Sequence, residues 1–157
     1  MDLREQAPMI RPARPEDAHS VRQLVQDAYG HYVARMGKPP GPMLDDYVRR
    51  IAEGQAWVLE EDGRLAGVLV LEDAPEGSLL LDNVAVAPFA RGKGHGRALI
   101  AFAEAEARRR GHREVRLYTH VLMTENLMLY ARLGYRETGR VSEKGYERVY
   151  MAKATVA

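Results

Sequence analysis

Cysteine is absent from this chain of 157 residues, which also contains only one tryptophan and two phenylalanines. The lack of cysteine excludes disulfide bonds, thiolate metal sites and a cysteine nucleophile. No apolar run approaches the ~20 residues that a membrane-spanning helix needs, and the N-terminus lacks the apolar core of a secretory signal. These absences predict a cytoplasmic protein without a membrane partner.

Neither sign of charge dominates the chain, because 23 basic residues accompany 22 acidic ones. The two halves differ, however: residues 1–78 carry 9 basic and 14 acidic side chains, whereas residues 79–157 carry 14 and 8. A basic C-terminal half suits phosphate groups, either on nucleic acid or on a small anionic cofactor. The arginine run at 108–110 has no aromatic platform beside it and is typical of a solvated helix end, so we expect no nucleic-acid partner.

Helical and strand patterns alternate along the chain without a repeat or a linker, which predicts a single domain over residues 1–157. Strands are expected at 9–11, 56–60, 65–72, 78–86, 115–119, 135–140 and 146–153. Helices are expected after Pro15, around 44–51, and at 94–110 and 124–133, whereas residues 30–42 hold too much Gly and Pro for one regular element. Hairpins on both sides of a helical crossover predict an α+β fold with a mixed sheet and helices on its faces.

A glycine-rich turn joins the strand ending near residue 86 to the longest helix, and it reads Arg91-Gly92-Lys93-Gly94-His95-Gly96. Glycines leave the backbone N–H groups unobstructed, and the helix N-terminus adds the positive end of its dipole. The turn is therefore a cradle suited to a pyrophosphate. It fits neither the P-loop, which requires Ser or Thr after Lys93, nor the dinucleotide pattern G-x-G-x-x-G. The pattern that fits is R-x-x-G-x-G, a weak signal by itself.

The segments around this turn strengthen the signal. The turn follows a strand that reads L-D-N-V-A-V-A-P, and 30 residues after Gly96 the chain reads N-L-M-L-Y-A-R-L-G-Y. In these segments the sequence resembles the GCN5-related N-acetyltransferase (GNAT) superfamily, and the resemblance extends over nearly the whole chain. It implies a mostly antiparallel sheet of about seven strands whose central strands splay apart to hold an acyl-CoA.

The resemblance implies acetyl-CoA as co-substrate and no metal ion. Backbone groups of β-strand residues 84–86 would bond the pantetheine arm as an added strand. A β-bulge near Asn83–Val84 would aim an N–H at the thioester carbonyl, and the glycine-rich turn would hold the pyrophosphate. An asparagine lies four residues before Tyr130, whereas many relatives have one seven residues before, where this chain has Met123. The residues expected to bind the cofactor are Val84, Ala85, Val86, Arg91, Gly92, Lys93, Gly94, His95, Gly96, Arg97 and Asn126.

The reaction that the resemblance implies is direct attack of a primary amine on the thioester, with CoA thiolate leaving. Tyr130 occupies the family's usual acid position in Y-A-R-L-G-Y, and the alternative is a core aromatic of its helix. Two positions where relatives use a glutamate base are Leu80 and Tyr118 here. Asp82 and His120 are the nearest substitutes, and a water chain without a dedicated base is the alternative.

The wall of the acceptor site is expected in the segment that follows the first helix, with simple loop packing as the alternative. Its candidate residues are Tyr29, Tyr32, Arg35, Met36, Lys38, Met43, Asp46 and Tyr47. Aromatic residues together with charges of both signs favour a small polar amine as the acceptor. The sequence leaves open whether the chain forms a homodimer. Two other functions compete with a small-molecule N-acetyltransferase: acetylation of a protein lysine or N-terminus, and acyl-CoA binding by a regulatory domain that has lost its chemistry.

Overall fold

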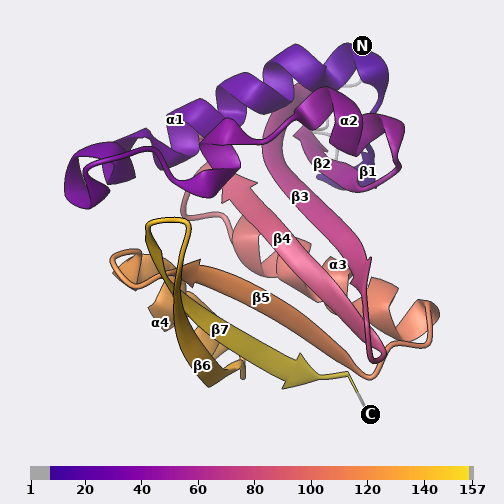
Figure 1. Ribbon diagram of the computed structural model, residues 1–157. Coiled ribbons are helices and arrows are strands. Elements are labelled where there is room, and N and C mark those ends of the chain that lie inside the picture. The colour runs from indigo at the N-terminus through magenta and orange to yellow at the C-terminus, as the bar shows by residue number, and fades with distance from the viewer. Residues whose placement is uncertain (1–7, 156–157) are drawn as a thin grey trace.

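In the computed structural model, which describes residues 8–155, helices flank one seven-stranded sheet of order β1-β2-β3-β4-β5-β7-β6 (Figure 1). The strands are β1 (Met9–Pro12), β2 (Ala56–Glu61), β3 (Arg64–Ala74), β4 (Ser78–Val86), β5 (Glu114–His120), β6 (Arg136–Glu143) and β7 (Tyr146–Ala154). Neighbouring strands are antiparallel except for β4 and β5, which are parallel. The predicted α+β fold is confirmed.

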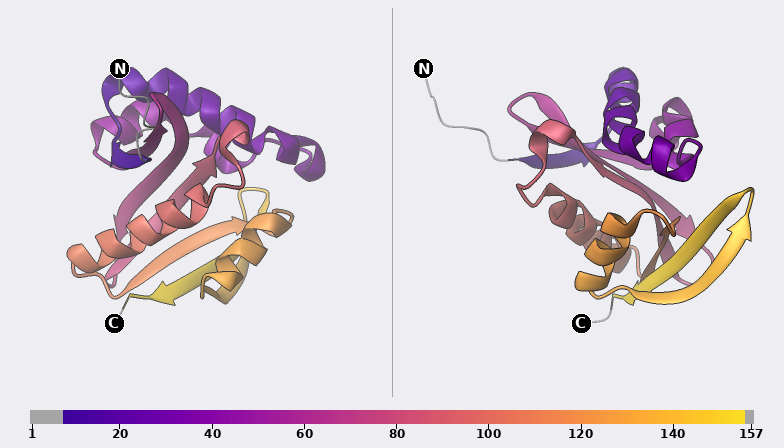
Figure 2. Two further views of the ribbon diagram at one scale, coloured as in Figure 1. Left: turned by 180° about the vertical axis from the view of Figure 1, so that it is seen from behind. Right: turned by 90° about the vertical axis from the view of Figure 1, so that its left-hand side faces the viewer.

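Two pairs of helices cover opposite faces of this sheet (Figure 2). The helices are α1 (Ala18–Met36), α2 (Tyr47–Ala52), α3 (His95–Arg109) and α4 (Thr124–Arg132). One apolar core lies between the sheet and the α3–α4 side, and includes Leu99 and Leu117. The other lies under α1 and includes Val25 and Val68. Within residues 8–155 no helix combines the length and the apolar character that crossing a bilayer requires.

Helix α1 is longer than the sequence pattern predicts. It continues through Gly30 to Met36, and the irregular segment begins only at Gly37. The helix continues because Tyr32 extends the buried stripe of α1, while Gly30 lies on the exposed side, where its cost of about 1 kcal/mol relative to alanine is tolerated. Gly37 ends the helix in the left-handed conformation at φ 77°. Part of the expected acceptor loop is therefore helical.

A β-bulge in β4 changes which side chains face the two cores. Asp82 is the extra residue, because Leu81 and Asn83 lie opposite consecutive residues of β3. Before the bulge Leu79 faces the α3 core, and after it Val84 does. Asp82 and Asn83 therefore both reach the α1 side of the sheet. The bulge falls one residue before the expected position.

The parallel pairing of β4 and β5 covers only the first half of each strand, and its last pair is Leu81 with Leu117. Strand β5 goes on to pair with β7 as far as His120, whereas β4 bends at its bulge and stays paired with β3. The two central strands therefore diverge toward their C-terminal ends, as Figure 1 shows. The predicted splay of the central strands is confirmed.

Gly67 tests the packing of this sheet. A Cβ added there would lie 2.8 Å from Leu99 Cδ1, 3.3 Å from the Ala85 carbonyl oxygen and 3.4 Å from Leu59 Cβ. We expect Gly67→Ala to lower the free energy of unfolding by roughly 1–3 kcal/mol, because the crowded core has to move. Gly30→Ala is the matched control, since a Cβ there meets nothing within 4 Å, and it should stabilise by about 0.5–1 kcal/mol. Urea denaturation measures both, and equal effects would contradict the packing.

Candidate active site

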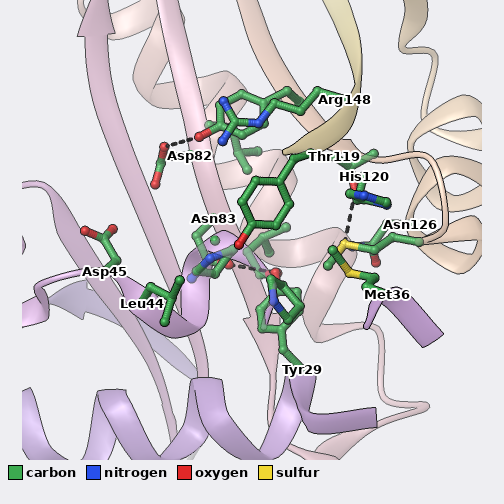
Figure 3. A pocket seen from close by; sticks show the side chains of 18 of the residues that line it. Tyr29, Met36, Leu44, Asp45, Asp82, Asn83, Thr119, His120, Asn126 and Arg148 are labelled. Carbon is green, nitrogen blue, oxygen red and sulfur yellow. Dashed lines mark hydrogen bonds between the residues drawn. The ribbon is translucent and has the colours of Figure 1, made fainter. Parts of the chain in front are cut away.

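A cavity of about 310 Å³ lies where β4 and β5 diverge, between the end of α1 and the β6–β7 hairpin (Figure 3). It brings together residues from both splayed strands, α1, α4 and the hairpin. Its polar lining residues are Tyr29, Asp45, Arg50, Asp82, Asn83, Tyr118, Thr119, His120, Asn126, Tyr130, Tyr146 and Arg148. A second hollow of about 300 Å³ shares Tyr29, Val84 and Asn126 with it. The cavity and the second hollow therefore adjoin each other at the gap between the splayed strands.

Tyr130 enters the cavity from α4 and is 5% exposed. Its ring packs edge-on against Tyr135, with 6.0 Å between the centroids. Burial raises the pKa of the Tyr130 phenol, so the hydroxyl keeps its proton at neutral pH. Within residues 8–155 no other group hydrogen-bonds to this hydroxyl. Among the described residues the Tyr130 hydroxyl is therefore a donor without a partner, in the lining of the cavity.

Asp82 faces the cavity from the bulge of β4. Its Oδ2 lies 3.2 Å from Arg50 Nη2, and its Oδ1 accepts from the Tyr118 hydroxyl at 3.4 Å. Burial raises the pKa of Asp82 above its ordinary value, and Arg50 opposes this shift without cancelling it. A partly desolvated carboxylate of this kind accepts a proton more readily than one in water.

Arg50 of α2 is the centre of a charge cluster that the sequence analysis missed. Its guanidinium lies 2.9 Å from Asp45, 3.6 Å from Glu72 and 3.2 Å from Asp82, and the residue is 8% exposed. One cation among three carboxylates leaves this side of the cavity negative. No sequence signal distinguishes Arg50 from its neighbour Arg49, because its partners come from three separate segments.

His120, the other candidate base, lies on the opposite side of the cavity from Asp82 (Figure 3). Its Nδ1 accepts the backbone N–H of Leu122 at 3.1 Å. The proton of the neutral ring therefore lies on Nε2, which donates and does not accept. Burial, with the charge of Lys38 as a further cause, lowers the pKa of His120. This arrangement makes His120 a donor at neutral pH, and it favours Asp82 over His120 as proton acceptor.

The predicted acceptor residues divide into two groups. Tyr29 lines the cavity, and its hydroxyl donates to Asn83 Oδ1 at 2.7 Å and lies 2.9 Å from the Val84 carbonyl oxygen. Tyr47 lies outside the lining, where its hydroxyl accepts from Asn83 Nδ2 at 3.1 Å. Asn83 is 3% exposed, so the two tyrosines hold its amide in one orientation. Tyr47 supports the wall and does not form it.

Tyr32 and Arg35 also lie outside the main cavity, because they point from α1 toward α4. The Tyr32 hydroxyl donates to Glu125 at 3.2 Å, and Arg35 Nη1 lies 2.7 Å from the same carboxylate. Hydrogen bonds from Arg35 and Thr124 lower the pKa of Glu125 to about 2. These residues tie the two helices together across the splayed strands, beside the second hollow.

The glycine-rich turn offers a ligand its backbone N–H groups more than the charged side chains of Lys93 and His95. Gly92 and Gly94 adopt left-handed conformations at φ 82° and 81°, and Gly94 caps α3. The N–H groups at positions 95–97 are in the first helical turn, where no carbonyl four residues earlier in the helix accepts them. Lys93 Nζ lies 2.7 Å from Glu61 of β2, and His95 Nε2 lies 2.8 Å from it without the alignment of a hydrogen bond. Their side chains are therefore directed toward β2.

Two further cationic side chains of the turn differ in their contacts. Arg91 donates to the Ala28 carbonyl oxygen at 3.3 Å and lines the second hollow. Arg97 is exposed. Within the described residues its guanidinium has no ion-pair partner. Arg97 is therefore available to a phosphate without breaking an existing contact.

The backbone of β4 offers hydrogen-bonding groups to the open gap. The Ala87 N–H donates to the Ala66 carbonyl of β3, so the alternation of an antiparallel pair directs Ala85 to β3 as well. The N–H and C=O groups of Val84 and Val86 then face the gap left by β5. Ala85, which we expected to act with them, points its backbone away from the gap and its side chain into the α1 core.

A contact between two distant loops lies beside the cavity. Lys38 Nζ donates to the Gly145 carbonyl oxygen and lies 4.0 Å from the centre of the Tyr146 ring. The Tyr146 hydroxyl donates to the Pro39 carbonyl at 2.7 Å. We call this contact of residues 38–39 with residues 145–146 the roof. Tyr146 and the adjoining Pro40 line the cavity.

Comparison with known proteins agrees with this arrangement. The sequence model of the family described as "Acetyltransferase (GNAT) family" matches residues 18–135. "Probable N-acetyltransferase family 8 member 5" from Mus musculus is 33% identical over 97 residues, which cover 59% of this chain and 43% of that protein. "N-alpha-acetyltransferase 80" from Mus musculus is 36% identical over 134 residues, which cover 85% of this chain and 35% of that protein. The chain thus spans less than half the length of these two relatives.

Solved structures share the fold. The PaiA N-acetyltransferase from Thermoplasma acidophilum, in complex with coenzyme A, matches with a TM-score of 0.79 at 18% identity over 95% of this chain and 99% of that chain. The ribosomal-protein-S18-alanine N-acetyltransferase from Escherichia coli matches with a TM-score of 0.73 at 19% identity over 96% of both chains. The acetyltransferase yncA from Salmonella typhimurium, with acetyl-CoA, matches with a TM-score of 0.74 at 21% identity over 97% of this chain and 96% of that chain.

Substitution of Arg50 tests the charge cluster. We expect Arg50→Met to lower the free energy of unfolding by ~3 kcal/mol at neutral pH, because it leaves three carboxylates without their shared cation. The native pKa of Asp82 would rise further above the unfolded value of about 3.9, so the loss should be smallest near pH 4 and grow toward pH 7.

Arg49→Met is the matched control. Arg49 is exposed and forms a 3.4 Å ion pair with Glu53, so its loss should change stability by less than about 0.5 kcal/mol at either pH. Urea denaturation of both variants near pH 4 and near pH 7 measures this difference. A pH-independent loss in Arg50→Met would contradict the coupling between Arg50 and the carboxylates.

Proposed function

The chain belongs to the GNAT family of acetyltransferases, and we propose that it transfers an acetyl group from acetyl-CoA to a primary amine on a small molecule. The observation that carries this proposal is the divergence of β4 and β5 beside both Tyr130 and the glycine-rich turn. Unpaired strand backbone inside a protein needs a hydrogen-bonding partner. An extended pantetheine arm supplies one.

Acetyl-CoA would bind with its pyrophosphate on the N–H groups of the turn and with Arg97 as an added charge. Its pantetheine arm would bond the groups of Val84 and Val86 that face the gap. Asn126, which lines both hollows, would contact the cofactor where the two spaces meet. The thioester would then lie beside Tyr130, at the entrance to the main cavity.

The amine nitrogen would attack the thioester carbonyl carbon, a C–N bond would form, and the C–S bond would break. The Val84 N–H, just after the bulge, would stabilise the oxyanion of the intermediate. Before the attack, the ammonium form of the acceptor would pass a proton through a water molecule to the Asp82 carboxylate, because an alkylamine with a pKa near 10.4 is mostly protonated at neutral pH. Tyr130 would donate a hydrogen bond to the departing thiolate, and that bond strengthens as negative charge develops.

The roof favours a small acceptor over a polypeptide. Residues 38–39 and 145–146 contact one another beside the cavity, and a volume of about 310 Å³ is at the lower end for ligand sites. Acetylation of a protein amine is the second candidate, because the names of two similar proteins specify N-alpha- and ribosomal-protein acetylation. It would require the roof to open. A cytoplasmic location stays a prediction from the sequence.

Release of CoA thiol from acetyl-CoA, measured over a panel of small amines, amino acids, polyamines and peptides, tests the proposal. We expect turnover with at least one small amine and little with peptides. Turnover with peptides alone would move the function to protein acetylation. Acetyl-CoA binding without any turnover would indicate a regulatory domain.

Substitution of Gly94 tests the cradle. Valine does not readily adopt the φ of 81° at this position, so Gly94→Val should distort the first N–H groups of α3 and abolish the thermal shift with acetyl-CoA. In the unchanged protein, ligand at 100 times its Kd adds ~2.7 kcal/mol.

Gly111→Val is the control for strain. Gly111 follows the other end of α3 at φ 79°, also in open space, so this variant carries a similar backbone strain far from the cradle. It should lose stability and keep the acetyl-CoA shift. If Gly94→Val retains the shift, the pyrophosphate binds elsewhere.

Substitution of Tyr130 tests the leaving-group role. Tyr130→Phe keeps the buried ring and removes a hydroxyl that has no partner within residues 8–155, so folding and acetyl-CoA affinity should barely change. We expect kcat to fall ~10²-fold, the usual size of such a contribution. Tyr135→Phe, which removes the hydroxyl that donates to Glu104 at 3.0 Å outside the cavity, should leave kcat nearly unchanged. Steady-state kinetics of both variants measures the effect. If kcat of Tyr130→Phe stays within threefold of the unchanged protein, water and not Tyr130 stabilises the leaving thiolate.

A further inference from the structure

We infer that the acceptor carries a carboxylate as well as its amine, and that Arg148 of β7 binds this carboxylate. The inference rests on the proposed function and names its substrate class as amino acids. It comes from a residue that neither the family pattern nor the sequence analysis singles out, and from the placement of that residue relative to Asp82.

Arg148 faces the cavity because of the alternation of β7. Val149 and Met151 pack in the α3 core, so Arg148 lies on the opposite face, toward α1. It lines the cavity, and its side chain is 18% exposed. In Figure 3 its side chain lies along the upper edge of the view, between Asp82 and His120. A guanidinium that is mostly withdrawn from water relies on protein or ligand groups to satisfy its N–H donors.

Contacts on several sides hold the guanidinium in place. Its Nη1 donates to Glu143 Oε1 at 2.8 Å, and the same carboxylate oxygen accepts from the Tyr150 hydroxyl. Its central carbon lies 4.5 Å from the centre of the Tyr118 ring and 5.7 Å from that of Tyr146. A guanidinium has five N–H donors, and Glu143 is its only ion-pair partner within the described residues. Donors remain for an incoming anion.

A planar, oriented guanidinium fits a carboxylate through two parallel hydrogen bonds. A phosphate could use the same donors, but it carries more negative charge. The neighbouring cluster already holds three carboxylates around the single cation of Arg50. That negative side of the cavity repels a dianion more strongly than a monoanion. The charges therefore favour a carboxylate.

Tyr118 sets the distance between the two anchors. Its hydroxyl donates to Asp82 at one end, and its ring face lies under Arg148. The cation of Arg148, which would bind an anion, and the carboxylate of Asp82 therefore both contact the phenol of Tyr118, one at the ring face and the other at the hydroxyl. An amino acid has this pattern of charge, with an ammonium group for the Asp82 side and a carboxylate for Arg148. The carboxylate anchor also explains how a small amine would be oriented for attack.

The test compares the twenty L-amino acids with their carboxamides and their decarboxylated amines, in the CoA-release assay with the full chain. We expect at least one free acid to be acetylated with a kcat/KM at least 10-fold above that of its amide. Arg148→Gln should raise KM for that acid at least 10-fold with little change for the amide. Arg148→Lys, which keeps the charge without the planar fork, should restore part of the loss.

Arg140→Gln is the matched control, because Arg140 lies on the neighbouring strand β6, is exposed and pairs with Glu137 at 2.6 Å. It should leave the kinetics of acid and amide unchanged. O-Phosphoethanolamine is the phosphate probe, and its preference over every carboxylate would overturn the assignment of the anion. Equal turnover of acids, amides and simple amines would overturn the inference and leave the proposed function intact. Failure of the unchanged chain to acetylate any amine would overturn both.

Discussion

The early end of hydrogen bonding between β4 and β5 is the constraint on which the rest of the site depends. Pairing stops at Leu81 and Leu117 because the extra residue Asp82 bends β4 while β5 stays paired with β7. Unpaired strand backbone in the interior costs free energy unless a ligand or water satisfies it. The gap is therefore a defect in the sheet, and under the proposed function it is where the extended pantetheine arm binds.

The bulge also decides which side chains meet in the gap. It places Asp82 and Asn83 on the same side of the sheet, although neighbouring residues of a regular strand point to opposite faces. Asn83 is then fixed by Tyr29 and Tyr47, and Asp82 is drawn to Arg50. One inserted residue thus supplies a rigid wall, a buried carboxylate and a redirected backbone N–H within three positions of the chain.

The two parts of the site use different electrostatic groups: backbone N–H groups at the glycine-rich turn and charged side chains around the cavity. The glycine-rich turn relies on backbone N–H groups, while Lys93 and His95 are directed toward Glu61. The carboxylates around Arg50 make one wall of the cavity negative, and Arg148 places a cation on another. Because backbone donors do not change with side-chain rotamers, the proposed phosphate cradle would need little rearrangement on binding. The acceptor side, in contrast, depends on ion pairs between distant segments.

The sequence by itself determined the features that arise from neighbouring residues. The order of strands and helices, the cradle of glycines before α3, and the place of Tyr130 one turn after Asn126 all follow from local spacing and backbone preference. Tertiary structure alone decided the acceptor side. Tyr32 and Arg35 lie near the predicted site in sequence but turn toward Glu125, whereas Arg50 and Arg148 reach the cavity from segments that no local pattern connects. The physical reason is that a turn or a helix cap is specified within a few residues, whereas an ion pair such as Arg50 with Asp82 exists only after the sheet has brought together positions 32 residues apart.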